Sequence, residues 1–387
     1  MLGEDAYADV DGLLGPADER LREWYPGERP GRQPVHTVYV PADRFHPGIV
    51  AEWSAAARSA LDTHPPLPFP EELRDRVLAK LEREPIEDLR IDFEDGYGVR
   101  DDAEEDAAAR AAAAALRSGP MPPFVGLRCK SLEAPTRRRA IRTLDVFLDA
   151  LGPPPDGFVV TLPKVSVVEQ AHAMVVLCRA LETAHGLAAG QLGFEAQVET
   201  PPLVLAGDGT ATVARVIHAA GPRLRGLHYG TYDYSAACGI AAAHQRLDHP
   251  AADHAKAVLQ VAAAGTGVRL SDGSLNLLPV GDTGSVQAAW RLHAQLIHRS
   301  LERGFYQGWD LHPAQLPTRF GTTYAFFREG LTAAAGRLRD WLDRRAGGVL
   351  DEPATARALA GFLRRAVDCG AVDATETGFD RPALDNI

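Results

Sequence analysis

Short hydrophobic runs alternate along the chain with longer stretches whose apolar positions repeat at helical spacing. The short runs are bounded by glycine, proline or charged residues, which is typical of β-strands. A repeated order of strand then helix predicts a parallel sheet, and the eight strands expected here are the number that closes a (β/α)8 TIM barrel. The predicted strands are residues 36–42, 89–94, 124–130, 158–164, 194–200, 224–229, 257–263, which has the weakest pattern, and 308–312.

Amphipathic stretches fill the intervals between these strands. The predicted helices are residues 101–117, 135–151, 167–185, 211–220 and 286–303. After residue 317 the alternation stops, and two long helical stretches follow at 318–345 and 353–369. We therefore expect an N-terminal extension (1–34), a TIM-barrel domain (35–317) and a C-terminal helical extension (318–387).

Composition narrows the class of protein. A chain of 387 residues that is 45% hydrophobic and 24% charged fits a globular, enzyme-sized protein. Its formal charge of -11, with the acids dispersed, weighs against a nucleic acid or a membrane as partner. No signal peptide or membrane span is predicted, and four widely spaced cysteines favour a reducing compartment. We predict a cytoplasmic protein that acts on a small molecule.

Ionisable residues follow nearly every predicted strand. In a TIM barrel the chemistry takes place where strands end and βα loops begin, because those loops converge on one mouth. The residues concerned are Arg44 in PADR, Glu94 and Asp95 in DFEDGYG, Arg128 in RCKS, Lys164 in LPK, Glu199 in VET, Asp233 in YGTYDYS and His312 in LHPAQ.

Glu199 and Asp233 carry the sharpest hypothesis among these endings. They follow the fifth and sixth predicted strands, which lie about 4.8 Å apart when paired, so both carboxylates can point at one place. Two carboxylates with open positions suit Mg2+, with Mn2+ as the alternative ion. Taken singly, either acid could instead be a helix N-cap or an ion-pair partner.

Arg128 has a fork of donors that suits a carboxylate or phosphate, or it is a structural ion-pair partner of Glu94 or Asp95. Strand alternation places Asp92 and Glu94 on one face and Asp95 at the turn. We expect at least one of these acids to orient Arg128, Lys164 or a metal-bound water.

Lys164 has two interpretations: a Schiff-base nucleophile, or, preferred here, a counter-charge to the acidic cluster. His312 either caps the helix that follows or contacts the substrate, and capping is favoured. Gly230 is interpreted as a turn glycine. No G-x-G-x-x-G or Walker pattern follows a strand, so a nucleotide-binding loop is not predicted.

The strand endings resemble, in order, those of the HpcH/HpaI aldolase/citrate lyase family, and most closely its citrate lyase beta subunit and malyl-CoA lyase branch. YVPADR resembles the family's VPG-x-R segment, IDFEDGYG its DLED motif, GLRCKS its VR-x-N strand, TLPKV its LPKV strand and VET its metal-binding I-E-T. YGTYDYSAACG, LSDGSL and GWDLHPAQ resemble three later motifs. The resemblance covers about residues 35–317.

The resemblance implies a TIM barrel in which Glu199 and Asp233 hold magnesium and Arg128 binds the carboxylate or carbonyl of the substrate. The implied reaction is reversible carbon–carbon cleavage, or its aldol or Claisen-type reverse, in the EC 4.1 class. The substrate would be a 2-oxo or 2-hydroxy acid or a CoA ester, and a homo-oligomer is expected.

The remaining site residues are assigned by the same resemblance. Substrate binding is expected at Arg44, Glu94, Gly230 and His312 in addition to Arg128, and catalysis at Asp95, Lys164 and Arg128. Lys130 or Ser131 stands where the family has an asparagine. The C-terminal region lacks the family segment from which, in the lyases that act on CoA esters, a neighbouring subunit contributes an acid, and this leaves CoA specificity open. Three other functions are weighed against the lyase: a Schiff-base aldolase using Lys164, a pyruvate-enolate enzyme that transfers phosphoryl groups, and a non-catalytic barrel subunit.

Overall fold

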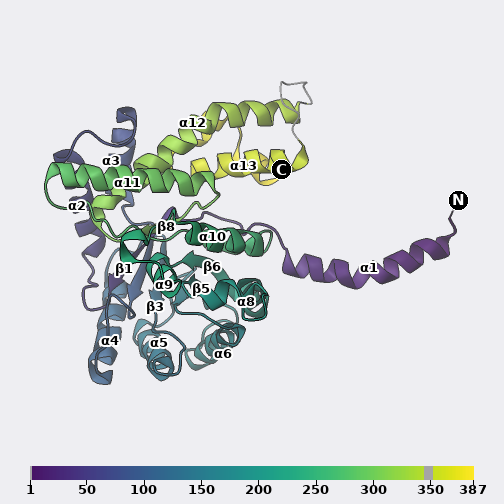
Figure 1. The fold of residues 1–387 in the computed structure, drawn as a ribbon, viewed down its shortest axis with the longest axis horizontal. Helices are drawn as coiled ribbons and strands as arrows, with labels where there is room; N and C mark the ends of the chain where they lie inside the picture. Colours follow the sequence, from purple (N-terminus) through teal and green to yellow (C-terminus); the bar gives the residue numbers. More distant parts are fainter. Residues whose placement is uncertain (1, 344–351) are drawn as a thin grey trace. The chain divides into compact units, whose positions relative to one another are not determined.

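Eight short strands lie side by side in the order β7-β6-β5-β4-β3-β2-β1-β8. Their bounds are β1 His36–Pro41, β2 Asp88–Asp92, β3 Phe124–Arg128, β4 Val159–Leu162, β5 Gly193–Val198, β6 Leu224–Tyr229, β7 Arg269–Ser271 and β8 Gly308–Asp310. The pairings of β1 with β2 and β8, and of β5 with β4 and β6, are parallel. An isolated parallel bridge joins Ser274, which follows β7, to Trp309 of β8, so the barrel is nearly closed. The predicted TIM barrel with a C-terminal helical extension is confirmed (Figure 1).

The computed structural model describes residues 2–343 and 352–387. The chain divides into two compact units. Unit 1 comprises Met1–Pro30 and Arg128–Leu270, and unit 2 comprises Gly31–Leu127 and Ser271–Ile387. The domain boundaries expected at 34 and 317 stay predictions, and the expected helix end at 345 lies outside the described residues.

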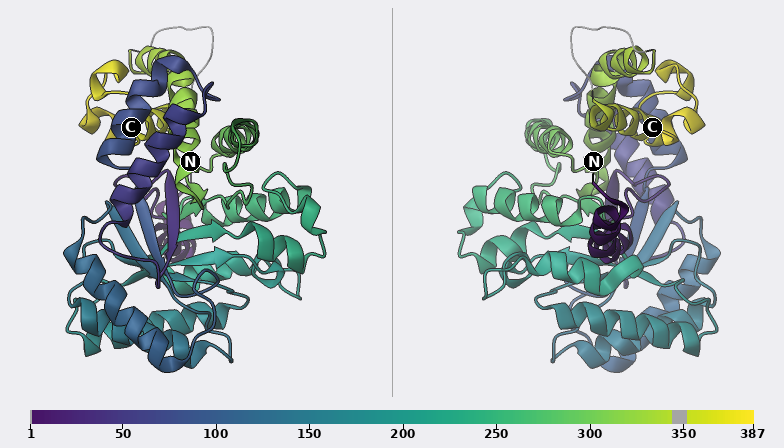
Figure 2. Two further views of the ribbon diagram at one scale, coloured as in Figure 1. Left: turned by 90° about the vertical axis from the view of Figure 1, so that its left-hand side faces the viewer. Right: turned by 90° about the vertical axis from the view of Figure 1, so that its right-hand side faces the viewer.

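The helices of unit 1 that follow residue 137 lie outside its strands, as the teal segments of Figure 2 show, whereas the purple α1 extends away from them. These helices are α1 Glu4–Trp24, α5 Arg137–Leu151, α6 Val168–Ala184, α7 Pro201–Val204, α8 Thr212–Ala220, α9 Thr231–Ala237 and α10 Pro250–Ala263. α8 packs against both α6 and α10. Short 3-10 turns, η2 Gly221–Arg223 and η3 Ala242–His244, complete the connections.

Unit 2 contributes the remaining helices. They are α2 Ile49–Thr63, α3 Arg74–Arg83, α4 Asp102–Ser118, α11 Thr283–Glu302, α12 Leu316–Leu342, α13 Pro353–Asp368, α14 Ala374–Thr377 and α15 Arg381–Asp385, with 3-10 turns η1 Glu71–Leu73 and η4 Pro313–Gln315. Asp101 and Asp282 begin α4 and α11 by accepting a backbone N–H three residues on. Leu338 and Leu363 join α12 to α13 in the apolar core of the C-terminal extension. No helix in the described part of the chain has the length and apolar character of a bilayer span.

The prediction of a seventh strand at residues 257–263 was wrong, because this segment is the end of α10. Leu259 and Ala263 are buried at helical spacing, whereas Val261 between them is 80% exposed. Pro250, at the first helical position, starts the helix. The true β7 has only three residues, which is too short to produce a recognisable alternation.

Strand β5 shows how the chain builds a polar barrel interior. Every residue from Gly193 to Glu199 is buried, although polar and apolar side chains alternate. Because successive side chains point to opposite faces of a strand, Glu195, Gln197 and Glu199 share one face. Glu195 accepts a hydrogen bond from Thr161 of β4 and lies 3.0 Å from His228 of β6. The polar face of β5 therefore points into the barrel interior, where it contacts side chains of the neighbouring strands. The apolar face packs against the helices.

A second buried polar cluster lies in unit 2 around Asp310 of β8. Its carboxylate receives a bidentate hydrogen bond from Arg319, with Nε and Nη2 each 3.0 Å from a carboxylate oxygen. His36 Nδ1 lies 2.7 Å and His293 Nε2 3.2 Å from the same carboxylate. Burial alone would raise the pKa of Asp310, but the charge of Arg319 and the hydrogen bonds of the two imidazoles hold it well below its ordinary value.

Replacing the carboxylate of Asp310 should therefore destabilise unit 2. We expect Asp310→Asn to lower the free energy of unfolding by about 3–5 kcal/mol, because a buried guanidinium loses its counter-charge. A depressed carboxyl pKa contributes stability above the unfolded-state pKa of about 3.9 and loses it as the pH falls through the folded value. The deficit measured by urea unfolding should thus be full at neutral pH and shrink in acid. As a control, Asp145→Asn removes an exposed partner of His185 and should cost less than about 1 kcal/mol. Equal costs at the two positions would contradict this account.

Candidate active site

Glu199 and Asp233 stand at the ends of adjacent strands in unit 1. Glu199 directly follows β5 and is only 3% exposed, while Asp233 lies in the first turn of α9, just after β6, with a half-exposed side chain. The N–H of Gly230 donates to the carbonyl of Val198 at 2.9 Å, which holds the two strand ends together. The pairing of β5 with β6 thus places both carboxylates on one side of the barrel, as their spacing in the sequence predicted.

Lys164 joins the two carboxylates. Its backbone N–H donates to Glu199 Oε1 at 2.7 Å, and its ammonium contacts Asp233 Oδ2 and lies 3.6 Å from Glu199 Oε1. Lys164 has a φ of 53°, the one positive φ outside glycine among residues 2–343 and 352–387. A side chain in this left-handed conformation costs about 1–2 kcal/mol. The contacts of the Lys164 N–H and ammonium with the two carboxylates offset that cost.

The raised pKa of Glu199 indicates that its ionised form needs a positive charge nearby. Burial raises the pKa of Glu199 to about 7, and the negative Asp233 acts in the same direction. The charge of Lys164, its backbone N–H and the charge of Arg128 oppose this rise. A buried acid with a strongly shifted pKa, surrounded by specific charged partners, is typical of a functional site.

Arg128 and Gln197 place hydrogen-bond donors beside these acids. Arg128 Nη1 donates to Gln197 Oε1 at 3.4 Å, and both side chains are buried. Because a guanidinium only donates, the amide of Gln197 must turn its oxygen toward Arg128 and its NH2 group elsewhere. That Nε2 is buried and finds no acceptor within the described chain. A buried donor of this kind is normally satisfied, so an oxygen atom of a ligand would supply the acceptor that the amide lacks.

Gly230 is required by its neighbour. Its φ of -98° is open to any residue, so the turn itself does not demand glycine. A Cβ added there would lie 2.5 Å from the Cβ of Glu199 and 2.8 Å from its Oε2. The interpretation of Gly230 as a turn glycine therefore misses its main effect, which is to leave space for the Glu199 carboxylate.

The other predicted site residues belong to unit 2. Arg44 and Asp95 are exposed, Glu94 is half-buried, and Asp92 accepts the N–H groups of Glu94 and Gly96 to shape the loop after β2. His312 Nδ1 accepts the N–H of Ala314 at 3.2 Å, which confirms the helix-capping interpretation. The substrate and catalytic roles of Arg44, Glu94, Asp95 and His312 stay predictions.

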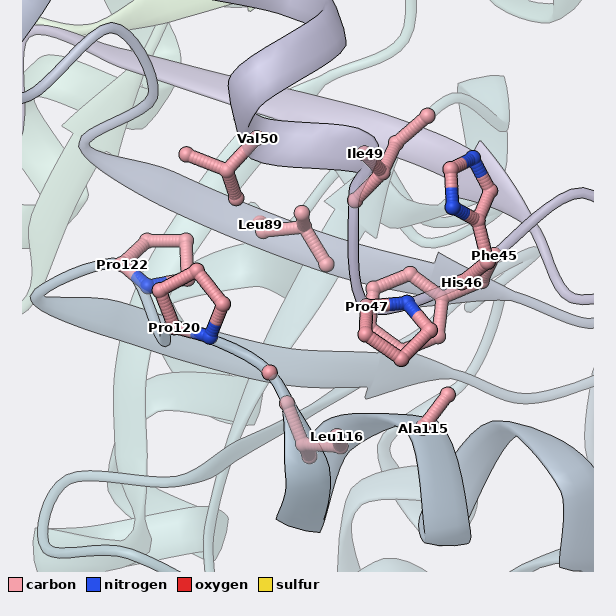
Figure 3. Close-up of a pocket in the computed structure, with 11 residues that line it drawn as sticks. Phe45, His46, Pro47, Ile49, Val50, Leu89, Ala115, Leu116, Pro120 and Pro122 are labelled. Atoms are coloured by element: carbon pink, nitrogen blue, oxygen red, sulfur yellow. The ribbon is translucent and has the colours of Figure 1, made fainter.

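Figure 3 shows a pocket in unit 2 that lies among apolar side chains, including Phe45, Leu89, Leu116 and Pro120. His46 is the one titratable residue of its lining. A site that performs acid–base or carboxylate chemistry needs converging polar groups, which this lining does not offer. We therefore place the candidate active site at the strand ends of unit 1.

The donor set at those strand ends fits a hard divalent cation. Carboxylate oxygens are the ligands that Mg2+ prefers, and the ammonium of Lys164 shows that a cation is accommodated between the two acids. Across the part of the chain that is described, no three His, Cys, Asp or Glu residues come together as metal ligands. A metal bound by Glu199 and Asp233 would therefore complete its coordination with water or substrate, which is the ordinary behaviour of Mg2+.

Fold and site together define a TIM-barrel protein with a carboxylate pair at the ends of β5 and β6. A family model described as "Domain of unknown function (DUF6986)" matches residues 14–387, and the chain belongs to that family. A comparison with curated proteins finds no match.

Two solved structures illustrate the likeness in fold. CitE from Mycobacterium tuberculosis, in complex with magnesium, acetoacetate and coenzyme A, is 20% identical, with a TM-score of 0.54 over 87% of this chain and 98% of that chain. Haloferax volcanii malate synthase, in a magnesium/glyoxylate complex, is 14% identical, with a TM-score of 0.53 over 92% and 98%. The resemblance to the citrate lyase branch is thus confirmed at the level of the fold.

The close contact at Gly230 gives a direct test of the site geometry. We expect Gly230→Ala to lower the free energy of unfolding by about 1–3 kcal/mol, because the new methyl group overlaps the Glu199 side chain. Gly207→Ala is the matched control, since a Cβ at Gly207 meets nothing within 4 Å. Chemical denaturation compares the two variants. A Gly230→Ala protein as stable as the Gly207→Ala protein would show that Glu199 does not occupy this position.

Proposed function

We propose that the chain is a magnesium-dependent carbon–carbon lyase or aldolase that acts through an enolate of a 2-oxo acid or acyl-CoA thioester. The observation that carries this proposal is the convergence of Glu199 and Asp233 on one cation, the Lys164 ammonium, beside the buried guanidinium of Arg128. Acids paired in this way at a barrel mouth are suited to a metal that binds substrate oxygens.

Glu199 and Asp233 are the residues that would hold the cation. A magnesium ion bound there supplies a positive charge that polarises a substrate carbonyl. The ammonium of Lys164 and a divalent ion would compete for the same two carboxylates. The backbone N–H of Lys164, which donates to Glu199 Oε1, would hold that carboxylate in either case.

Arg128 and Gln197 would bind and orient the substrate. Cleavage of a carbon–carbon bond next to a carbonyl leaves the electron pair as an enolate, so negative charge develops on the carbonyl oxygen. A guanidinium that is already fixed by Gln197 stabilises such charge without reorganisation. The free amide donor of Gln197 offers a second hydrogen bond to a carboxylate or carbonyl oxygen. A base must also accept the hydroxyl proton.

The solved relatives support the reaction class. CitE was crystallised with magnesium, acetoacetate and coenzyme A, and the malate synthase with magnesium and glyoxylate. Both combine a divalent ion with a small oxo acid, which matches two carboxylates and a buried arginine.

Magnesium binding can be measured without knowledge of the substrate. A ligand that binds only the folded state raises the free energy of unfolding, by about 2.7 kcal/mol at a concentration 100 times Kd. We expect millimolar magnesium to raise the melting temperature relative to sodium chloride of equal ionic strength. Glu199→Gln and Asp233→Asn should each abolish this rise, because each removes one of the two ligands.

The exposed Asp208, whose carboxylate accepts hydrogen bonds from Thr210 of its own loop, provides the control for that experiment. Asp208→Asn should respond to magnesium as the wild type does. A wild-type protein with no response at millimolar magnesium would contradict the metal site.

Gln197 allows substrate binding to be tested separately from metal binding. We expect Gln197→Leu to weaken the binding of pyruvate or glyoxylate to the magnesium-loaded protein about 10- to 100-fold, the cost of one hydrogen bond to a charged group. The response to magnesium alone should stay unchanged, since Gln197 is not a proposed ligand. Isothermal titration measures both quantities. Unchanged affinity for both oxo acids would show that Gln197 and its partner Arg128 do not bind the substrate.

A Schiff-base aldolase remains the alternative because Lys164 lies at the centre of the site. A nucleophilic lysine must be a neutral amine, and two carboxylates favour its charged form instead. We therefore expect no covalent adduct when the protein is treated with pyruvate and borohydride. Trapping of pyruvate on Lys164, shown by mass spectrometry, would replace the metal mechanism with the covalent one.

A further inference from the structure

Over most of its length, from Tyr7 to Leu21, helix α1 presents an apolar stripe that nothing in the described chain covers. None of its residues is buried. The large apolar residues are separated by three, four, seven and three positions, which places them on one face of the helix. They are Tyr7, Val10, Leu14, Leu21 and Trp24, each between 43% and 56% exposed. Figure 1 shows α1 extending away from α8 and α10 of the same unit.

This helix is poorly suited to exist alone. It contains Gly12, Gly15 and Pro16, which are the residues least favourable to a helix interior. Isolated helices of this length are marginal in water even with favourable sequences. A stable α1 therefore requires a surface that packs against its apolar stripe.

The point at which α1 leaves unit 1 is firmly held. Trp24 stacks on His218 of α8 with ring centroids 4.4 Å apart, and Tyr25 meets the same ring edge-on. The N–H of Gly27 donates to the carbonyl of Gly265, just after α10, at 2.9 Å. Because a helix rises about 1.5 Å per residue, Glu4 lies roughly 30 Å from this anchor.

The charges of α1 and of the surface at its base are opposite. α1 carries seven acidic residues and only two arginines. At the base, Arg29 donates to the carbonyls of Gly267 and Leu224, and Arg269 donates to the carbonyl of Pro30. Burial, and then the charges of Arg225 and Arg269, lower the pKa of Arg29 to about 10. Arg29 and Arg225 have no acidic partner among the residues that the structure describes, although both are half-buried.

We propose that α1 docks on unit 1 of a second copy of this chain. Its apolar stripe would cover the outer face of α8 and α10, where Val261 is 80% exposed, and its acids would face the base cluster of Arg29, Arg225 and Arg269. Since each copy offers both the helix and the cluster, the contact is reciprocal and closes as a two-fold dimer. The acidity of α1 argues against an anionic lipid surface as the occupant. This inference is independent of the proposed function.

Sedimentation equilibrium of the full chain tests the proposal. The wild type should be a dimer, and Leu14→Asp with Leu21→Asp should raise the dimer Kd by roughly 100-fold or more, because two charges enter the apolar contact. Both leucines are exposed, so neither substitution removes a contact from the core of the barrel. Val176→Asp, at a valine of α6 that is 62% exposed, is the matched control and should leave the dimer intact.

Charge reversal tests the second half of the contact. Arg225→Glu should weaken the dimer, and adding Asp9→Arg with Asp11→Arg to that variant should restore association at least in part. A monomeric wild type, or an oligomer that the leucine variants leave intact, would overturn the proposal. A dimer broken by the leucine variants but indifferent to Arg225→Glu would overturn the assignment of the base cluster as its receiving surface.

Discussion

The site depends on one electrostatic constraint: two carboxylates, one of them almost fully buried, converge at the ends of neighbouring strands. Glu199 loses the solvation that would normally keep it charged, and Asp233 adds repulsion. Positive charge must therefore be supplied at this point. Lys164 supplies it directly and Arg128 contributes from the end of β3, and the left-handed backbone of Lys164 is the geometric consequence.

The barrel interior extends the same constraint along β5. Glu195, Gln197 and Glu199 occupy one face of a strand that is buried on both sides, and each has a partner from another strand or strand end. Such a polar interior is stable only when its groups are paired. The one amide donor of Gln197 without a partner is therefore the informative exception, because it lies beside Arg128 where a substrate oxygen is expected.

Much of this arrangement was predictable from the sequence, for physical reasons that also explain the failures. Seven strands were predicted correctly because period-two patterns are local features. The convergence of Glu199 and Asp233 could be predicted because both acids come soon after strands that pair, whereas their role as metal ligands stays a prediction. The prediction of the seventh strand was wrong because the β-branched residues at 257–263 favour a strand locally. The helical spacing of the buried positions in this segment was given too little weight. The space that Gly230 leaves for Glu199 depends on a contact between strands, and no local pattern encodes it. Gln197 was missed although the alternation in FEAQVET signals a polar interior face. The carboxylate pair and Arg128 fall within one unit, whereas the roles of Arg44, Glu94, Asp95 and His312 stay predictions.

The most direct measurement of the central claim is the affinity for magnesium of Lys164→Met, compared by isothermal titration with the wild type and with Lys164→Arg. If the ammonium occupies the position of the cation, its removal should tighten magnesium binding at least about tenfold, or about 1.4 kcal/mol. Lys164→Arg, which keeps the charge, should bind as the wild type does. Weaker binding by Lys164→Met, or no detectable binding by any of the three proteins, would contradict the account.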